Sequence, residues 1–247
     1  MEQNFKDKRV LITGASKGLG KAAAIAFEQK GARLALAARS DSKLAALKES
    51  FGDPGKHLIF NLDLLDSTNI KKLTSDVIKK WDGVDVILHC VGGSMGVNET
   101  LVDWEDFVKC LKGNIGIASE INRYLAPGMR EQSSGSIIHV GSIVGSEARA
   151  SVPYNTCKAA LSGYVRSLGK ELALKNIAVN CVTPAAAKTR IFDQMTQEHI
   201  DYMLSKIPRN RFAKVNELAS LVTWLASEEN SFSTSAVFDL SGGRATY

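Results

Sequence analysis

The chain has 247 residues, of which 45% are hydrophobic and 23% are charged, and its formal net charge is +5. This composition excludes a globally disordered chain and supplies enough apolar side chains for a large core. Because the lysines are spread along the sequence, the charge indicates a basic, soluble surface, with a nucleic-acid or acidic carrier partner as the alternative.

Neither a membrane span nor a metal site is expected. No stretch reaches about 18 uninterrupted apolar residues, and the start, MEQNFKDKRV, has no apolar signal core. The four cysteines are not spaced as a metal knuckle, and Cys90 and Cys181 stand in apolar runs that predict buried thiols. We therefore expect a reduced, cytoplasmic protein.

Short apolar runs alternate with segments of helical period. The predicted strands are 9–13, 32–38, 57–62, 84–91, 135–142, 177–183 and 235–240. The predicted helices are 18–30, 41–51, 66–80, about 101–111, 114–131, 153–175 and 215–227. This alternation predicts an α/β fold, a single-domain Rossmann-like doubly wound parallel sheet of about seven strands over residues 1–247. The polar and aromatic segment 184–214 breaks the rhythm and predicts an insert that covers a site.

A glycine-rich turn, TGASKGLG, follows the first predicted strand and precedes a helix. Gly14, Gly18 and Gly20 give the spacing G-x-x-x-G-x-G, which lets a backbone approach a pyrophosphate closely at a helix N-terminus. The position predicts dinucleotide binding, against the alternative of a structural β-α turn.

The residues after the second and third strands bear on cofactor choice. NAD-binding folds place a carboxylate after the second strand, whereas here Arg39 stands there and favours a 2′-phosphate, with Lys17 as a second cation. Asp41 is expected to cap the next helix. Asp63 is a candidate for the adenine amino group, or ordinary loop polarity beside a cap at Asp66. NADP is therefore favoured over NAD.

The stretch YNTCK carries the candidate acid. Tyr154 and Lys158 are four residues apart, so a helix places them on one face. An ammonium there favours the phenolate and is expected to lower the tyrosine pKa. Such a pair also arises by chance as a solvated surface pair.

Together, TGASKGLG and YNTCK resemble the short-chain dehydrogenase/reductase family, in its form of about 250 residues that includes 3-oxoacyl and carbonyl reductases. Ser142 lies twelve residues before Tyr154, Asn114 opens NIGIASEINRYLAPGM, NCVTPAAAKT resembles the segment over the nicotinamide, and FDLSGG resembles the terminal signature. The resemblance implies that Tyr154 exchanges the proton and that Ser142 orients the substrate oxygen. It also implies that Lys158 binds the nicotinamide ribose and that Asn114 holds a relay water, with no metal. The expected cofactor contacts are Gly14, Ser16, Lys17, Gly18, Leu19, Gly20, Arg39, Asp63, Leu64, Gly92, Tyr154, Lys158, Pro184 and Thr189.

Some positions depart from the family pattern. The family's N-N-A-G is HCVG at 89–92, and Ala185 replaces a glycine. His89 sits in an apolar strand, which favours a packed, hydrogen-bonded histidine over a catalytic one. These departures indicate a specialised member.

The expected function is NADPH-dependent reduction of a ketone. Alternatives are an NADP-linked alcohol dehydrogenase, a cofactor-binding regulator without turnover and, least favoured, a nucleic-acid module. We expect a mostly apolar pocket formed by residues 94–97, 143–152 and the insert, including Ile191, Phe192, Met195, Tyr202 and Met203, with Arg149 and Arg190 near a carboxylate or thioester. The resemblance implies a homo-oligomer, a tetramer or possibly a dimer, and surplus apolar residues on 153–175 support it.

Overall fold

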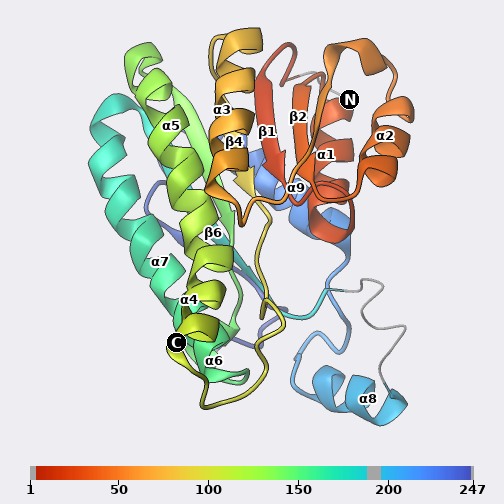
Figure 1. Cartoon of the computed structure of the whole chain (residues 1–247). Helices are drawn as coiled ribbons and strands as arrows, with labels where there is room; N and C mark the ends of the chain where they lie inside the picture. The colour runs from red at the N-terminus through yellow and green to blue at the C-terminus, as the bar shows by residue number, and fades with distance from the viewer. Residues whose placement is uncertain (1–3, 188–195, 246–247) are drawn as a thin grey trace.

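The computed structural model describes residues 4–187 and 196–245. One seven-stranded sheet runs through it in the order β3-β2-β1-β4-β5-β6-β7 (Figure 1), and each neighbouring pair is parallel. The strands are β1 (Arg9–Thr13), β2 (Arg33–Ala38), β3 (Leu58–Asn61), β4 (Val86–His89), β5 (Gly135–Val140), β6 (Ile177–Pro184) and β7 (Val237–Leu240). The predicted parallel α/β architecture is confirmed.

Helices cover both faces of the sheet and extend past one end of it. They are α1 (Gly18–Gln29), α2 (Asp41–Glu49), α3 (Ser67–Trp81), α4 (Trp104–Leu111), α5 (Ile117–Gln132), α6 (Val144–Glu147), α7 (Val152–Leu172), α8 (Gln197–Ser205) and α9 (Val215–Ala226). One apolar layer packs α3, α5 and α7 on the sheet, and a second packs α1, α2 and α9 on its other face. In Figure 1, α6 and α8 lie beyond the lower edge of the sheet.

Strand β1 shows why its apolar run is continuous. Leu11 belongs to the first layer, Val10 and Ile12 belong to the second, and all three are fully buried. Since successive side chains of a strand point to opposite faces, a sheet covered by helices on both sides needs apolar residues at every position.

The strand order reverses between β1 and β4, which places the loops after these strands side by side. A Cβ on Gly14 would come within 3.1 Å of the backbone carbonyl of Cys90. In open parallel sheets, ligands bind beyond the carboxyl ends of the strands at such a reversal. The fold therefore puts the candidate site where the glycine-rich turn meets the loop after β4.

Three local features differ from the sequence prediction. The helices predicted at about 101–111 and 114–131 form one continuous rod, because a π-helical turn at Lys112–Gly116 joins α4 to α5. Helices α6 and α8 were not predicted. The expected cap at Asp41 is wrong, since Asp41 is the first residue of α2 and Ser40 occupies the cap position.

The described ranges contain neither a membrane-spanning helix nor a cluster of metal ligands. None of the helices there is both long and apolar enough to cross a bilayer. Residues 4–187 and 196–245 contain no group of three or more His, Cys, Asp or Glu side chains placed to hold a metal ion.

Candidate active site

The glycine-rich turn after β1 is built by close backbone contacts. Gly14 and Gly18 have positive φ angles of 70° and 54°, a conformation that favours glycine. A Cβ on Gly20 would lie only 2.4 Å from the carbonyl oxygen of Gly14, so α1 packs directly on the turn. The N-terminus of α1, which presents backbone N–H groups and a partial positive charge, therefore begins beside this turn.

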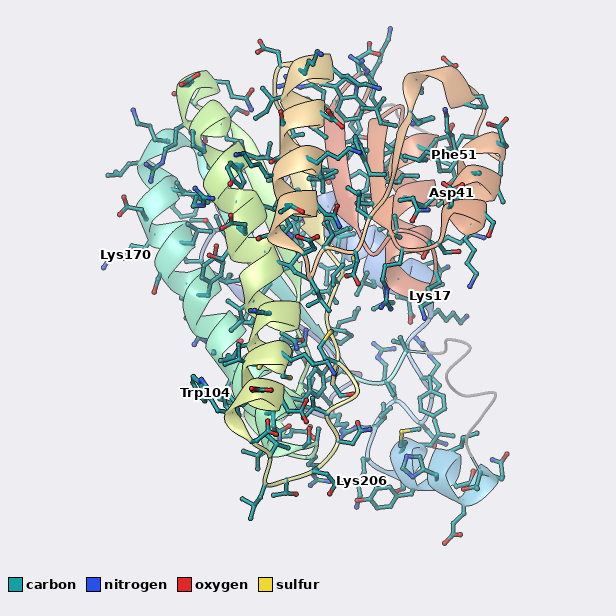
Figure 2. All side chains as sticks on the ribbon, in the orientation of Figure 1. Lys17, Asp41, Phe51, Trp104, Lys170 and Lys206 are labelled. Carbon is teal, nitrogen blue, oxygen red and sulfur yellow. The ribbon has the colours of Figure 1, made fainter. Side chains whose placement is uncertain are left out.

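Two exposed cations stand near this turn. Arg39 directly follows β2, Lys17 directly precedes α1, and neither makes an ion pair with a described residue. Figure 2 shows Lys17 at the end of α1 that faces the site. Ser16 and Leu19 are half-buried in the same turn. The residues present therefore suit the phosphates of a dinucleotide, including one on the ribose.

The loop after β3 contains two predicted cofactor contacts, Asp63 and Leu64, and the alternative helix cap, Asp66. Asp63 is exposed and its Oδ1 accepts the Leu65 N–H over 3.0 Å, so the carboxylate partly organises its own loop. Asp66 caps α3 by accepting the Thr68 N–H over 2.8 Å, which confirms the expected cap, while the role of Asp63 toward an adenine stays a prediction. The side chain of Leu64 belongs to the apolar core, which leaves only its backbone for a ligand.

The reversal point brings together Gly92, Asn114 and Lys158. A Cβ on Gly92 would lie 2.9 Å from Asn114 Oδ1 and 3.0 Å from Lys158 Nζ, so both polar groups border the same small space. Asn114 Nδ2 donates to the carbonyls of Gly93, over 2.8 Å, and Cys110, over 2.9 Å. Its position in the π-helical turn is typical of a functional helix distortion.

Lys158 is only 3% exposed. Its Nζ donates to the Val140 carbonyl over 3.1 Å at the end of β5. Burial lowers the pKa of Lys158, because the apolar surroundings disfavour the ammonium. A buried cation with one carbonyl partner keeps hydrogen-bonding capacity for a ligand.

Tyr154 lies in the first turn of α7, and Ser142 follows the end of β5. Burial raises the pKa of Tyr154, and interaction with the Ser142 side chain opposes that rise. The Lys158 ammonium faces the tyrosine ring, 5.8 Å from its centre. The expected lowering of the Tyr154 pKa is therefore wrong in this structure, and the phenol stays protonated at neutral pH.

The placement of α7, which carries Tyr154 and Lys158, depends on a close approach by α6. A Cβ on Gly145 would lie 2.7 Å from the backbone carbonyl carbon of Lys158. Pro153, in the first turn of α7, suits a position where no intrahelical N–H bond is needed. Helix α6 thus contacts the backbone of α7 directly at Lys158, whose side chain reaches the candidate site.

A cavity of about 480 Å³ opens beside Ser142. It is lined by Ser142, Ile143, Val144, Arg149, Pro184, Ala185, Ala186, His199, Tyr202, Met203, Lys206 and Arg244. Tyr202, Met203 and Arg149 were predicted here, whereas residues 94–97 do not line this cavity. The predicted Thr189, Arg190, Ile191, Phe192 and Met195 lie outside the described residues.

Sequence reasoning missed Lys206, Arg244 and His199. Arg244 follows the terminal FDLSGG by one residue, which was the available signal, and Lys206 ends a helix that was not predicted. The cavity is consequently more cationic than the mostly apolar pocket that was expected.

His89 is packed and hydrogen-bonded, as predicted. It is 4% exposed, its Nε2 lies 2.9 Å from Asn122 Oδ1, and its ring stacks on His139 with 4.7 Å between centres. Asn122 Nδ2 in turn donates to the Tyr164 hydroxyl over 3.1 Å. Burial lowers the pKa of His89 to about 4, so the neutral ring joins β4 to α5.

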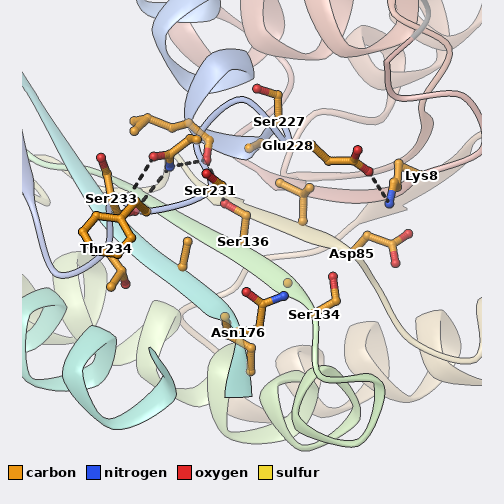
Figure 3. Close-up of a pocket in the computed structure, with 18 of the residues that line it drawn as sticks. Lys8, Asp85, Ser134, Ser136, Asn176, Ser227, Glu228, Ser231, Ser233 and Thr234 are labelled. Atoms are coloured by element: carbon orange, nitrogen blue, oxygen red, sulfur yellow. Dashed lines mark hydrogen bonds and ion pairs between the residues drawn. The ribbon is translucent and has the colours of Figure 1, made fainter. Parts of the chain in front are cut away.

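A second cavity, of about 440 Å³, lies at the opposite, amino-terminal ends of β5 and β6 (Figure 3). Its polar groups largely satisfy one another. Asn230 Nδ2 donates to the Leu225 carbonyl over 3.0 Å, and Lys8 pairs with Glu228 over 3.8 Å. It contains none of the predicted site residues, whereas the cavity beside Ser142 contains several of them.

Similarity to known proteins agrees with this geometry. Residues 14–245 match the family model described as enoyl-(acyl carrier protein) reductase. The chain is 35% identical to 2-dehydro-3-deoxy-L-rhamnonate dehydrogenase (NAD(+)) of Sphingomonas sp., over 98% of this chain and 97% of that protein. It is 33% identical to the 3-oxoacyl-(acyl-carrier-protein) reductase of Thermotoga maritima, over 97% and 98%.

The fold is also shared with a solved enzyme. The L-sorbose reductase of Gluconobacter frateurii, solved with NADPH and L-sorbose, superposes with a TM-score of 0.89 at 28% identity over 100% of both chains. The family model matches most of the chain, and both curated relatives are more than 30% identical to it. Either finding is sufficient to assign the family. The chain belongs to the short-chain dehydrogenase/reductase family of oxidoreductases.

Proposed function

We propose that this protein reduces a ketone to an alcohol with NADPH, with Tyr154 as the general acid. The observation that carries the proposal is the convergence of Tyr154, Ser142 and Lys158 at the carboxyl ends of β4 and β5, beside Gly92. Tyr154 is a protonated phenol beside Ser142, whose hydroxyl lines the cavity. Protonation of a substrate oxygen needs this arrangement.

The four groups divide the work. Tyr154 gives its proton to the substrate oxygen, and Ser142 hydrogen-bonds that oxygen and orients it. Lys158 holds the ribose of the nucleotide, and Asn114 holds a water that returns protons from solvent. When bound, the nicotinamide nucleotide supplies the hydride, so the site needs no metal.

NADP is favoured over NAD by the charge near the glycine-rich turn. Arg39 and Lys17 are exposed cations, and the position after β2 carries no carboxylate. A guanidinium suits a phosphate on the ribose, because it donates two parallel hydrogen bonds. The L-sorbose reductase was solved with NADPH, while the Sphingomonas relative is named for NAD(+).

The oxidative direction is the second candidate. The Sphingomonas relative is named a dehydrogenase, and the same groups would then act in reverse, with the Tyr154 phenolate as the base. The names of the relatives also span two substrate types, a sugar acid and an acyl-carrier-protein thioester.

The test is direct. NADPH fluorescence measures binding, and loss of NADPH absorbance with a panel of ketones measures turnover. We expect tight NADPH binding and turnover with at least one ketone. Binding without turnover of any ketone or alcohol would instead assign the protein as a regulator.

We further propose a homo-oligomer, most simply a tetramer, in which α7 meets a second copy. Ala159, Ala160 and Gly163 form an exposed stripe of small residues on this helix, and a Cβ on Gly163 would meet nothing within 4 Å. Gly163→Glu should therefore spare the protomer but dissociate the assembly, as measured by light scattering. A wild-type mass near 26.7 kDa would contradict the assembly.

A cytoplasmic location is proposed on the cysteines. All four are unpaired thiols. Unpaired thiols are typical of a reducing compartment.

A further inference from the structure

The walls of the cavity beside Ser142 carry more positive than negative charge. Arg149, Lys206 and Arg244 line it, and Glu147 is the carboxylate that contacts two of them. Since the proposed chemistry takes place at the Ser142 edge of this cavity, the charge on its walls bears on what the substrate carries besides its ketone.

One wall of the cavity is formed by Arg149 and Arg244, whose guanidinium groups share the Glu147 carboxylate. Glu147 has a side chain only 6% exposed, and its Oε2 accepts from Arg244 Nε over 3.1 Å and Nη2 over 3.0 Å. Arg149 Nε lies 3.7 Å from the same oxygen. Arg149 makes no hydrogen bond with any described residue, and its side chain is 50% exposed. This wall therefore has a net positive charge, with the donors of Arg149 available to a ligand.

Another part of the lining is the end of α8. Lys206 directly follows the last residue of this helix, where a cation is favoured by the helix dipole. Its Nζ lies 5.2 Å from the centre of the Tyr202 ring, and it pairs with no carboxylate of residues 4–187 or 196–245. Figure 2 shows Lys206 near the lower edge of the molecule, between α6 and α8.

We propose that the substrate is a small oxo acid whose carboxylate binds between Arg149 and Lys206 while its ketone meets Ser142 and Tyr154. The proposal rests on the proposed reduction. In a concave site, cations with free donors attract an anion, and an Arg and a Lys together can satisfy both carboxylate oxygens. The rest of the lining includes Ile143, Pro184 and Ala185, which suit a short carbon chain.

A thioester is the competing substrate class. Its acyl carbonyl is uncharged, so the acyl group offers no anion to Arg149 or Lys206 next to the ketone, and the phosphates of its carrier lie at the far end of the pantetheine arm. The charges of Arg149 and Lys206 would then add nothing to the affinity for a bound thioester. Removal of these cations should therefore weaken the use of an oxo acid and leave the use of a thioester unchanged.

The experiment compares matched substrates. Pyruvate, acetoacetate and levulinate, their methyl esters, and acetoacetyl-CoA are assayed with NADPH. We expect at least one acid to have a kcat/KM about tenfold or more above its ester, the scale of one charge-assisted pair. Arg149→Gln and Lys206→Gln should lower that ratio toward one, mainly through KM. The control is Lys170→Gln, an exposed lysine that Figure 2 places on the opposite side of the molecule from α8, and it should leave the ratio unchanged.

Two results would overturn the inference. One is an ester or acetoacetyl-CoA that is used as well as the acid by the wild type. The other is an acid preference that survives in both cavity variants.

A binding measurement separates this inference from the proposed reaction. If no compound oxidises NADPH, the proposed function fails. Thermal unfolding of the NADPH-loaded protein with each acid and ester then decides the inference. Stabilisation by acids alone, lost in Lys206→Gln but kept in Lys170→Gln, supports the carboxylate site. Equal effects of acid and ester, or no effect of either, contradict it.

Discussion

The nucleotide side of the site and its substrate side are held together in different ways. On the nucleotide side, Gly14 and Gly20 are six residues apart and fix the turn by direct backbone contact. On the substrate side, Glu147 and Arg244 are 97 residues apart and join α6 to the C-terminal segment. The contrast teaches that short sequence spacing encodes cofactor binding, whereas long-range pairing shapes the substrate cavity.

A change at α6 should break the substrate side and spare the nucleotide side. Gly145→Ala puts a Cβ 2.7 Å from the backbone of Lys158, so α6 or α7 must shift. We expect kcat to fall by about a hundredfold, the scale of a small misplacement in a catalytic site. NADPH affinity, measured by fluorescence, should change much less. Gly128→Ala on α5 is the control, since a Cβ there would meet nothing within 4 Å. Equal loss of kcat in both variants would contradict the role of the α6 contact.

Removal of the cations near the glycine-rich turn should have the converse effect. Arg39→Ala combined with Lys17→Ala removes the groups assigned to the 2′-phosphate. A charge-assisted hydrogen bond contributes about 1.5–3 kcal/mol, so NADPH affinity should fall roughly ten- to a hundredfold while NADH affinity is spared. Equal use of NADH and NADPH by the wild type would rule out this assignment.

The pH dependence should reveal the state of Tyr154. Burial raises its pKa, and Ser142 opposes the rise. Reduction needs the protonated phenol, so its rate should stay flat through neutral pH and decline only at alkaline pH. Oxidation needs the phenolate, so its rate should rise with pH. Ser142→Ala removes the group that lowers the pKa, and the alkaline limb should move to higher pH. A limb that moves to lower pH would contradict this assignment.

The same contrast explains how far sequence reasoning reached. All strand positions and most helix positions followed from apolar periodicity, and Gly14 followed from the spacing of the glycine-rich turn, because these signals are local. Tyr154 and Lys158 shared a helix face by spacing, but their roles came from the family resemblance. The π-helical turn at Lys112–Gly116 and the cations Lys206 and Arg244 of the cavity lining were not predicted. Arg244 is held at the cavity by Glu147, 97 residues away in sequence, and periodicity does not report such a contact. The direction of the Tyr154 pKa was missed because sequence spacing does not report burial, which raises this pKa and outweighs the opposing Ser142 side chain.

The most direct test of the account is Tyr154→Phe. The phenylalanine ring fills the same space but cannot give a proton, so turnover with a ketone should fall by about 10²–10⁴ while the NADPH dissociation constant stays within about threefold, well under 1 kcal/mol. Tyr124→Phe on α5 should leave both quantities near the wild-type values. Retention of more than about a tenth of the wild-type rate by Tyr154→Phe would contradict the central claim, because general acid catalysis contributes more than that.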